Sequence, residues 1–202
     1  MSSTVLGQSV RRSGAHSLTT MVIHLLVAAS VVHQLFSSLV MHVPFRGGSG
    51  GLLWQAHQAV GLSAIGVLTL FWLWMVVRRG ETRWSRLFPW FTAAGWASLR
   101  GDAEEHLVSL RRLRLPTGHD RPLASATHGL GLLCASAVAV SGLGWFLAPG
   151  TLLRWLALNI HGTLGNAMWA YLIAHAGLAL LHQLGGEAIL QRMFGFLAPR
   201  AD

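Results

Sequence analysis

Long runs of apolar residues alternate with shorter polar segments along most of this chain. Four runs, residues 18–40, 52–77, 123–147 and 160–184, are long enough to cross a hydrocarbon core, which takes about 20 helical residues. Because lipid offers backbone groups no hydrogen-bond partner, each run is expected to form a helix. The pattern predicts an all-α integral membrane protein, a single domain over residues 1–202 in which four transmembrane helices form one bundle.

The composition supports a membrane protein over a soluble domain. Hydrophobic residues make up 52% of the chain and charged residues 11%, and the mean hydropathy is +0.50, outside the usual range of soluble domains. All seven acidic residues lie outside the four runs. The single cysteine, Cys134, lies inside the third run, and the chain has no C-x-x-C-H haem-attachment motif. Any haem here would be bound non-covalently.

The arginines indicate the orientation of the chain. All 15 basic residues are arginines, and nine of them lie between the second and third runs. By the positive-inside rule, this middle segment and both termini are expected in the cytoplasm. The first run is too long for a signal-peptide core, so it is expected to be retained. The formal charge of +8 therefore reflects topology and lipid contact, and nucleic acid is not expected as a partner.

The middle segment, residues 78–121, is expected to lie at the membrane surface on the cytoplasmic side. The spacing of Asp102 and Glu105 is typical of a capping box at the start of a helix. Leucines after it are expected to face the membrane, with arginines beside them contacting anionic lipid. These residues are Leu107, Leu110, Leu113, Arg111, Arg112 and Arg114. A solvated helix without a special role and docking of a cytoplasmic partner remain alternatives.

Histidines carry the strongest functional signal, because an ionisable ring inside a membrane span is costly unless it has a partner. Seven of the 11 histidines lie within the four runs or at their edges: His24, His33, His57, His128, His161, His175 and His182. For the other four, His16, His42, His106 and His119, a surface role is expected.

Helical geometry sorts the intramembrane histidines into two levels. His161 and His175 are 14 residues apart, so their rings face the same way with a rise of about 21 Å between them. His57 lies at the depth of His161, near the periplasmic side. His24 lies at the depth of His175, nearer the cytoplasm. The spacing predicts two stacked sites, one with His57 and His161 and the other with His24 and His175.

Opposed pairs of neutral imidazoles are the axial ligands that six-coordinate haem b requires, so the four histidines are candidate ligands of two haem irons. A small residue follows each histidine by one helical turn, which leaves room for a flat macrocycle: Ala28, Gly61, Gly165 and Ala179. Ordinary polar contacts between helices remain an alternative for any single ring. Zinc lacks enough protein ligands in the spans, and a proton relay lacks its usual carboxylates.

Several further residues are candidates for supporting roles. His128 and His182 are candidate contacts of a haem propionate or a quinone headgroup, with a plain interhelix contact as the alternative. Met168, midway between His161 and His175, is expected to pack between the two haems. Arg46 and Arg154 are candidates for steering an anionic donor toward the periplasmic haem, with interfacial anchoring as the alternative.

Three motifs make the chain resemble the bacterial cytochrome b561 family, four-helix di-haem b membrane proteins related to the b-type cytochrome subunits of nickel-iron hydrogenases. They are "MVIHLL" in the first run, "WQAHQAVG" in the second and "HGTLGNAMWAYLIAHAGLALLH" in the fourth; "THGLGLL" in the third also looks family-like. The family's four haem ligands would fall on His24, His57, His161 and His175, the residues that the depth argument selects.

The resemblance implies respiratory electron transport between a periplasmic donor or acceptor and the quinone pool, possible cofactors being two haem b groups and ubiquinone. Some members are similar to superoxide oxidases, which pass an electron from superoxide to ubiquinone. Others serve as membrane subunits, so a c-type cytochrome, a dehydrogenase or a hydrogenase subunit is a candidate partner. An electron-relay cytochrome is the preferred interpretation, a superoxide:ubiquinone oxidoreductase is the first alternative, and a haem-free membrane anchor or transporter is the second.

Overall fold

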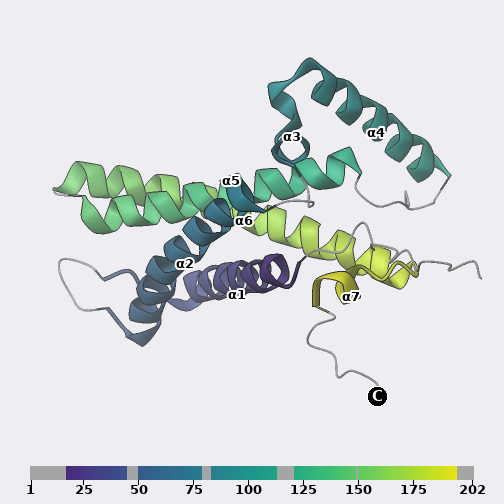
Figure 1. Ribbon diagram of the computed structural model, residues 1–202. Coiled ribbons are helices and arrows are strands. Elements are labelled where there is room, and N and C mark those ends of the chain that lie inside the picture. The colour runs from purple at the N-terminus through teal and green to yellow at the C-terminus, as the bar shows by residue number, and fades with distance from the viewer. Residues whose placement is uncertain (1–16, 45–49, 79–82, 113–120, 149, 195–202) are drawn as a thin grey trace, which may run out of the picture.

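The computed structural model describes residues 17–44, 50–78, 83–112, 121–148 and 150–194 (Figure 1). Every regular element in these ranges is a helix, and four of the helices are long and apolar enough to cross a membrane. The all-α membrane fold expected from the sequence is therefore confirmed. The four long helices are α1 (Leu18–Val40), α2 (Leu52–Val77), α5 (Pro122–Leu147) and α6 (Thr151–Leu184).

The first two long helices cover the same residues as the first two apolar runs, whereas α6 begins well before residue 160. Its first turns follow Gly150, which has a φ of +79°, a conformation that glycine adopts without strain. The charge of Arg154 interrupts the apolar run without interrupting the helix. At 34 residues, α6 is about 51 Å long, so it either tilts in a bilayer or projects beyond the hydrocarbon core.

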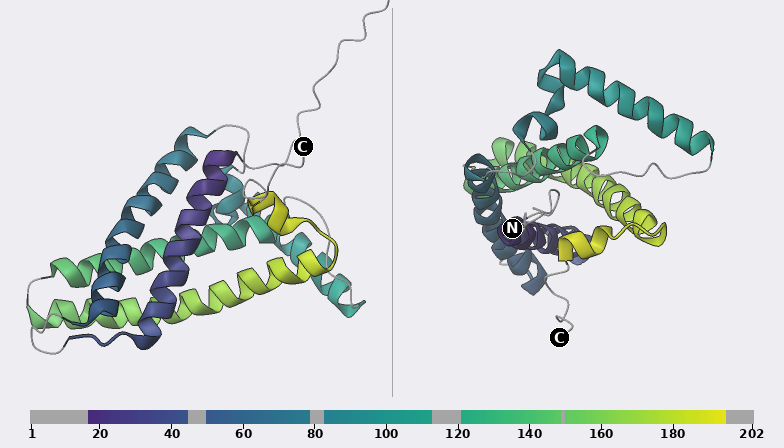
Figure 2. Two further views of the ribbon diagram at one scale, coloured as in Figure 1. Left: turned by 90° about the horizontal axis from the view of Figure 1, so that it is seen from below. Right: turned by 45° about the vertical axis from the view of Figure 1, so that its right-hand side comes forward.

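The long helices pack as two antiparallel hairpins, α1 with α2 and α5 with α6. The hairpins cross each other (Figure 2), and α2 against α5 is the main contact between them. Where they cross, Leu35, Leu68, Leu132 and Met168 form part of a common core. Large apolar side chains on the outer faces stay exposed, as lipid-facing residues do. The core is therefore small and concentrated at the crossing.

Four further helical elements complete the described part of the chain, and only α4, with 19 residues, is longer than two turns. The middle segment holds α3 (Trp84–Leu87), a 3-10 turn η1 (Pro89–Phe91) and α4 (Ala93–Arg111), and α7 (Ile189–Phe194) follows α6. In Figure 1, α3 and α4 lie beside the beginning of α5, and both contact it.

The expected capping box at Asp102 is wrong. Helix α4 begins nine residues earlier, after Thr92, whose side chain accepts a hydrogen bond from the Gly95 N–H. Asp102 lies inside α4 and is buried. Its carboxylate accepts hydrogen bonds from the backbone N–H of Leu123 at 2.8 Å and from Nε of Arg121 at 2.7 Å. Asp102 therefore caps the start of α5 rather than the start of its own helix.

Arg121 joins α4 to α5 through its hydrogen bond to Asp102. We call this contact the Asp102–Arg121 clasp. The Arg121 guanidinium also hydrogen-bonds Glu105 at 2.7 Å. Partial burial opposes the charge of Arg121, but the hydrogen bonds and negative charges of Asp102 and Glu105 outweigh it and raise the pKa of Arg121. Arg121 therefore stays charged at neutral pH. Leu113 and Arg114 of the expected lipid-facing surface lie outside the described residues.

Candidate functional site

A cavity of about 470 Å³ lies where the two hairpins cross, with walls from α1, α2, α5 and α6. Most of the lining is apolar, and small residues, among them Gly61, Gly142 and Gly165, widen it. Polar side chains are few in this lining, and two of them are imidazoles, His57 and His161. Such a cavity, apolar with a few convergent polar groups, is typical of a cofactor site.

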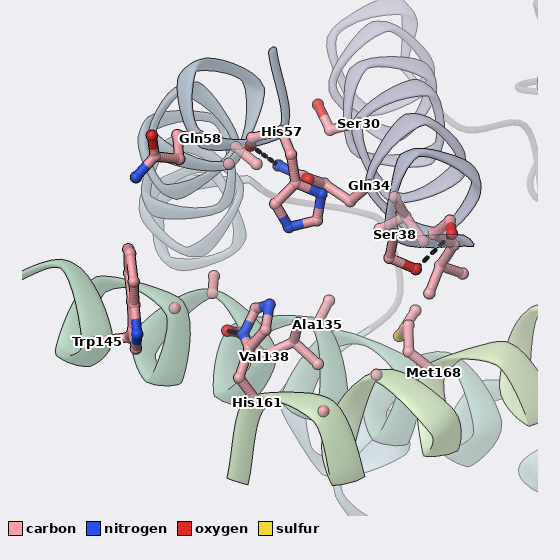
Figure 3. A pocket seen from close by; sticks show the side chains of 18 of the residues that line it. Ser30, Gln34, Ser38, His57, Gln58, Ala135, Val138, Trp145, His161 and Met168 are labelled. Atoms are coloured by element: carbon pink, nitrogen blue, oxygen red, sulfur yellow. Dashed lines mark hydrogen bonds between the residues drawn. The ribbon is translucent and has the colours of Figure 1, made fainter. Parts of the chain in front are cut away.

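His57 and His161 face each other across the cavity. His57 comes from α2 and His161 from α6, so each hairpin contributes one ring (Figure 3). The ring centres are 6.2 Å apart and the ring planes are nearly perpendicular, at 86°. The sequence placed these two histidines at the same depth, and the crossing of the hairpins brings them face to face.

Hydrogen bonds favour one tautomer of His57, in which the Ser37 hydroxyl donates to a backbone carbonyl and accepts from the ring. Its Nδ1 lies 2.8 Å from Oγ of Ser37 on α1. The Ser37 hydroxyl donates its own proton to the carbonyl of Gln34 at 3.1 Å, so it can only accept from the ring. His57 therefore carries its proton on Nδ1, which leaves the Nε2 lone pair available. The Gln34 side chain donates to the backbone carbonyl of His57 at 2.8 Å, as the dashed line in Figure 3 shows.

The same protonation follows for His161 from a different set of partners. Its Nδ1 lies 2.9 Å from the carbonyl of Val138 on α5, which can only accept. Oγ of Ser141 is also within 3.2 Å of this nitrogen. In both rings Nδ1 hydrogen-bonds to a protein oxygen, which leaves Nε2 available for a ligand. Metal-binding histidines show the same pattern.

These residues fit a haem. A nitrogen ligand lies about 2 Å from a first-row metal, so two imidazoles on opposite sides of one iron have ring centres about 6 Å apart, close to the observed spacing. A Cβ added at Gly165 would meet no atom within 4 Å, so this wall leaves room for a flat macrocycle. In the part of the chain that the structure describes, no group of three or more His, Cys, Asp or Glu side chains is placed to hold a metal ion.

The second expected pair has a different geometry. The His24 ring lies 6.3 Å from the Phe194 ring of α7. The His175 ring lies edge-to-face with His128 at 5.0 Å and stacks on Tyr171 at 5.3 Å. His175 thus contacts His128, which the sequence had assigned only a supporting role, and ligation by His24 and His175 stays a prediction.

Of the other residues expected to have supporting roles, the structure describes His182, Met168 and Arg154. His182 lies near Glu187, with 3.6 Å between Nδ1 and a carboxylate oxygen. Met168 is buried at the crossing and lines the cavity. The exposed Arg154 places its guanidinium 5.5 Å from the centre of the Trp145 ring and donates to the carbonyl of Ala148 at 3.1 Å. Arg46 lies outside the described residues.

Residues that the sequence did not single out complete the surroundings of the two rings. Trp54 stacks parallel to His57, with ring centres 6.5 Å apart, and Trp145 packs against Trp54 at 5.2 Å. Ser37 and Ser141 bond the ring nitrogens as described above. The repeated spacing could have identified these serines from the sequence, because each serine precedes its histidine by 20 residues.

Comparison with known proteins gives one match. The family model described as prokaryotic cytochrome b561 matches residues 15–196, which is nearly the whole chain. Neither the curated proteins nor the solved structures yield a match.

Proposed function

This chain belongs to the prokaryotic cytochrome b561 family, and from that membership we propose that it carries two haem b groups and passes electrons between a periplasmic redox partner and the membrane quinone pool. Membership makes it a multi-pass membrane b-type cytochrome in electron transfer. The number of haems, their ligands and the partners are the proposed part. So are the location in the bacterial inner membrane, which the family supports, and the cytoplasmic position of both termini, which the arginine distribution supports.

One observation carries the proposal: His57 and His161 approach from opposite hairpins across an apolar cavity, each with Nδ1 committed to a protein acceptor. We assign these two rings as the axial ligands of the haem nearer the periplasm. When bound, haem supplies a reversible one-electron couple. The residues of the cavity hold the ligand nitrogens in place and exclude water, and among the residues that the structure describes no carboxylate lines this cavity.

His24 and His175 are the proposed ligands of the second haem, nearer the cytoplasm. The support is their matched depth on α1 and α6 together with the resemblance of the motifs around them. His128, whose ring contacts His175, and His182 are proposed contacts of a propionate or a quinone headgroup. Candidate donors or acceptors are a c-type cytochrome and a dehydrogenase or hydrogenase subunit.

A superoxide:ubiquinone oxidoreductase is the second candidate function. The observation that favours it is the exposed Arg154, which lies on Trp145, a residue of the cavity wall. A cation at this position attracts small anions toward the cavity. Stopped-flow consumption of superoxide in the presence of ubiquinone separates this enzyme from a simple relay, because the relay does not consume superoxide catalytically.

The test of the proposed function is the haem content of the purified full chain in detergent. A dithionite-reduced spectrum with b-type bands and about two haems per chain is expected. His57→Ala and His161→Ala should each lose one haem, because one axial ligand is removed. His42→Ala is the matched control, since His42 is exposed beyond the end of α1. A colourless wild type after reconstitution with haem would favour a haem-free anchor or transporter and refute the proposal.

A further inference from the structure

The two hairpins repeat one arrangement of site residues. In each hairpin a serine lies near the end of the first helix, a histidine follows 20 residues later on the second helix, and a glycine follows one turn after the histidine. Corresponding residues are 104 positions apart: Ser37 and Ser141, His57 and His161, Gly61 and Gly165. Each hairpin thus supplies one histidine to the cavity and one serine that lies within hydrogen-bond distance of that histidine.

The serines also bond their own helices in the same way. Ser37 donates its hydroxyl proton to the carbonyl of Gln34 at 3.1 Å, and Ser141 donates to the carbonyl of Val138 at 2.9 Å. In both cases the acceptor is three residues earlier on the same helix. Each hydroxyl therefore presents only a lone pair to the nearby imidazole.

The two hairpins differ in the number of hydrogen-bond acceptors near Nδ1 of the histidine. Nδ1 of His161 lies 2.9 Å from the Val138 carbonyl and 3.2 Å from Ser141. For Nδ1 of His57, the acceptor that the structure gives is the Ser37 hydroxyl at 2.8 Å. His161 keeps a backbone acceptor if its serine is removed, whereas His57 loses the acceptor that orients it.

The burial of Ser37 and a hydrogen bond from Gln34 hold Ser37 beside His57. Ser37 is buried, and the Gln34 side chain ties α1 to the backbone carbonyl of His57 at 2.8 Å. A Cβ at Gly61 would come within 2.7 Å of that amide nitrogen. The absence of a side chain at Gly61 therefore allows Gln34 to reach α2, one turn from His57.

We propose that Ser37 is a positioning residue for the periplasmic haem, holding the tautomer and orientation of His57, and that Ser141 is dispensable for the same task at His161. This inference rests on the proposed function, because it assumes that both rings bind one iron. A hydrogen bond from Nδ1 to an acceptor increases the electron donation of the imidazole and favours ferric iron. Losing the acceptor should therefore raise the midpoint potential of that haem and weaken its binding.

The experiment compares Ser37→Ala, Ser37→Thr and Ser141→Ala in the full-length protein in detergent. Haem is titrated into each apoprotein, and the midpoint potentials of the bound haems are measured by spectroelectrochemistry. For Ser37→Ala we expect haem affinity at one site to fall about 10-fold or more and one of the two midpoint potentials to rise. Ser37→Thr keeps the hydroxyl and should behave as the wild type. Ser141→Ala should leave both affinities and both potentials unchanged.

Each result bears on the proposal. Equal effects of Ser37→Ala and Ser141→Ala would overturn it, and so would a Ser37→Thr variant as damaged as Ser37→Ala, since that would indicate a packing role. A lower midpoint potential in Ser37→Ala would contradict the assigned direction of the hydrogen bond. A wild type without haem would overturn the proposed function itself, which is a distinguishable failure because it precedes any comparison of variants.

Discussion

Gly165→Leu should weaken the binding of one haem while leaving the folded chain intact. Gly165 lies one turn after His161 on α6 and lines the cavity. A Cβ at this position would meet no atom within 4 Å, so a leucine here enters open space rather than a neighbouring helix. The space it takes is the space that the proposed haem needs.

The magnitudes favour a stable variant with a blocked site. Replacing a helical glycine by leucine favours the helix by about 0.8–1 kcal/mol, and burying the added side chain stabilises by up to about 1.5–3 kcal/mol. The added leucine side chain would, by contrast, overlap the space that the proposed haem occupies. Overpacking costs about 1–3 kcal/mol, which corresponds to about a 5- to 150-fold loss of affinity.

The assay measures haem per chain from the reduced spectrum and thermal unfolding of the haem-free protein in detergent. Gly66→Leu on α2 is the matched control, because Gly66 is exposed, a Cβ there meets nothing within 4 Å, and it does not line the cavity. In a haem titration we expect Gly165→Leu to bind one haem about 5- to 150-fold more weakly than the wild type, at unchanged or higher unfolding temperature. Wild-type affinity for both haems at wild-type potentials in this variant would refute the placement of a haem in the cavity.

Three further predictions concern the clasp, the packing of the α5–α6 hairpin and the exposed arginine. Asp102→Ala should destabilise the junction of α4 and α5 by about 1–3 kcal/mol, because the part-buried Leu123 N–H loses its acceptor, and hydrogen exchange near the start of α5 should rise. Because the pKa of Arg121 is raised, the stability that Arg121 contributes is present below the ordinary arginine pKa and lost only as pH rises through the raised value, so the protection of this junction relative to intrinsic amide exchange should not change between about pH 6 and about pH 9. Gly131→Ala should lower the unfolding temperature, since its Cβ would overlap the Tyr171 ring, at a cost of about 1–3 kcal/mol. Arg154→Gln should slow haem reduction by a small anionic donor about 10-fold at low ionic strength, with the difference disappearing in high salt.

Matched substitutions control each of these predictions. Glu104→Ala removes an exposed carboxylate of α4 and should leave the exchange unchanged; an equal effect would show that the clasp is not responsible. Gly66→Ala has open space and should not lower the unfolding temperature. Arg100→Gln removes an arginine of α4 rather than of α6, so a loss of rate equal to that of Arg154→Gln would argue against local steering.

The apolar pattern alone was sufficient to predict the helices. Runs of this length in lipid have no other way to satisfy their backbone groups, and α1 and α2 cover the residues of the first two runs. The pattern was insufficient where a charge or a long-range contact intervened. Arg154 concealed the first turns of α6, and Asp102 looked like a cap of its own helix although its carboxylate caps α5.

For the candidate site, helical periodicity determined which histidines share a face and a depth, because rise and rotation per residue are properties of a single helix. The position of each histidine, counted from the end of its own span, placed His57 and His161 at one level from the sequence alone. The partners of their Nδ1 atoms and the contact of His175 with His128 depended on how the two hairpins cross. That crossing is set by side-chain packing between segments far apart in the chain, which no pattern along a single helix encodes.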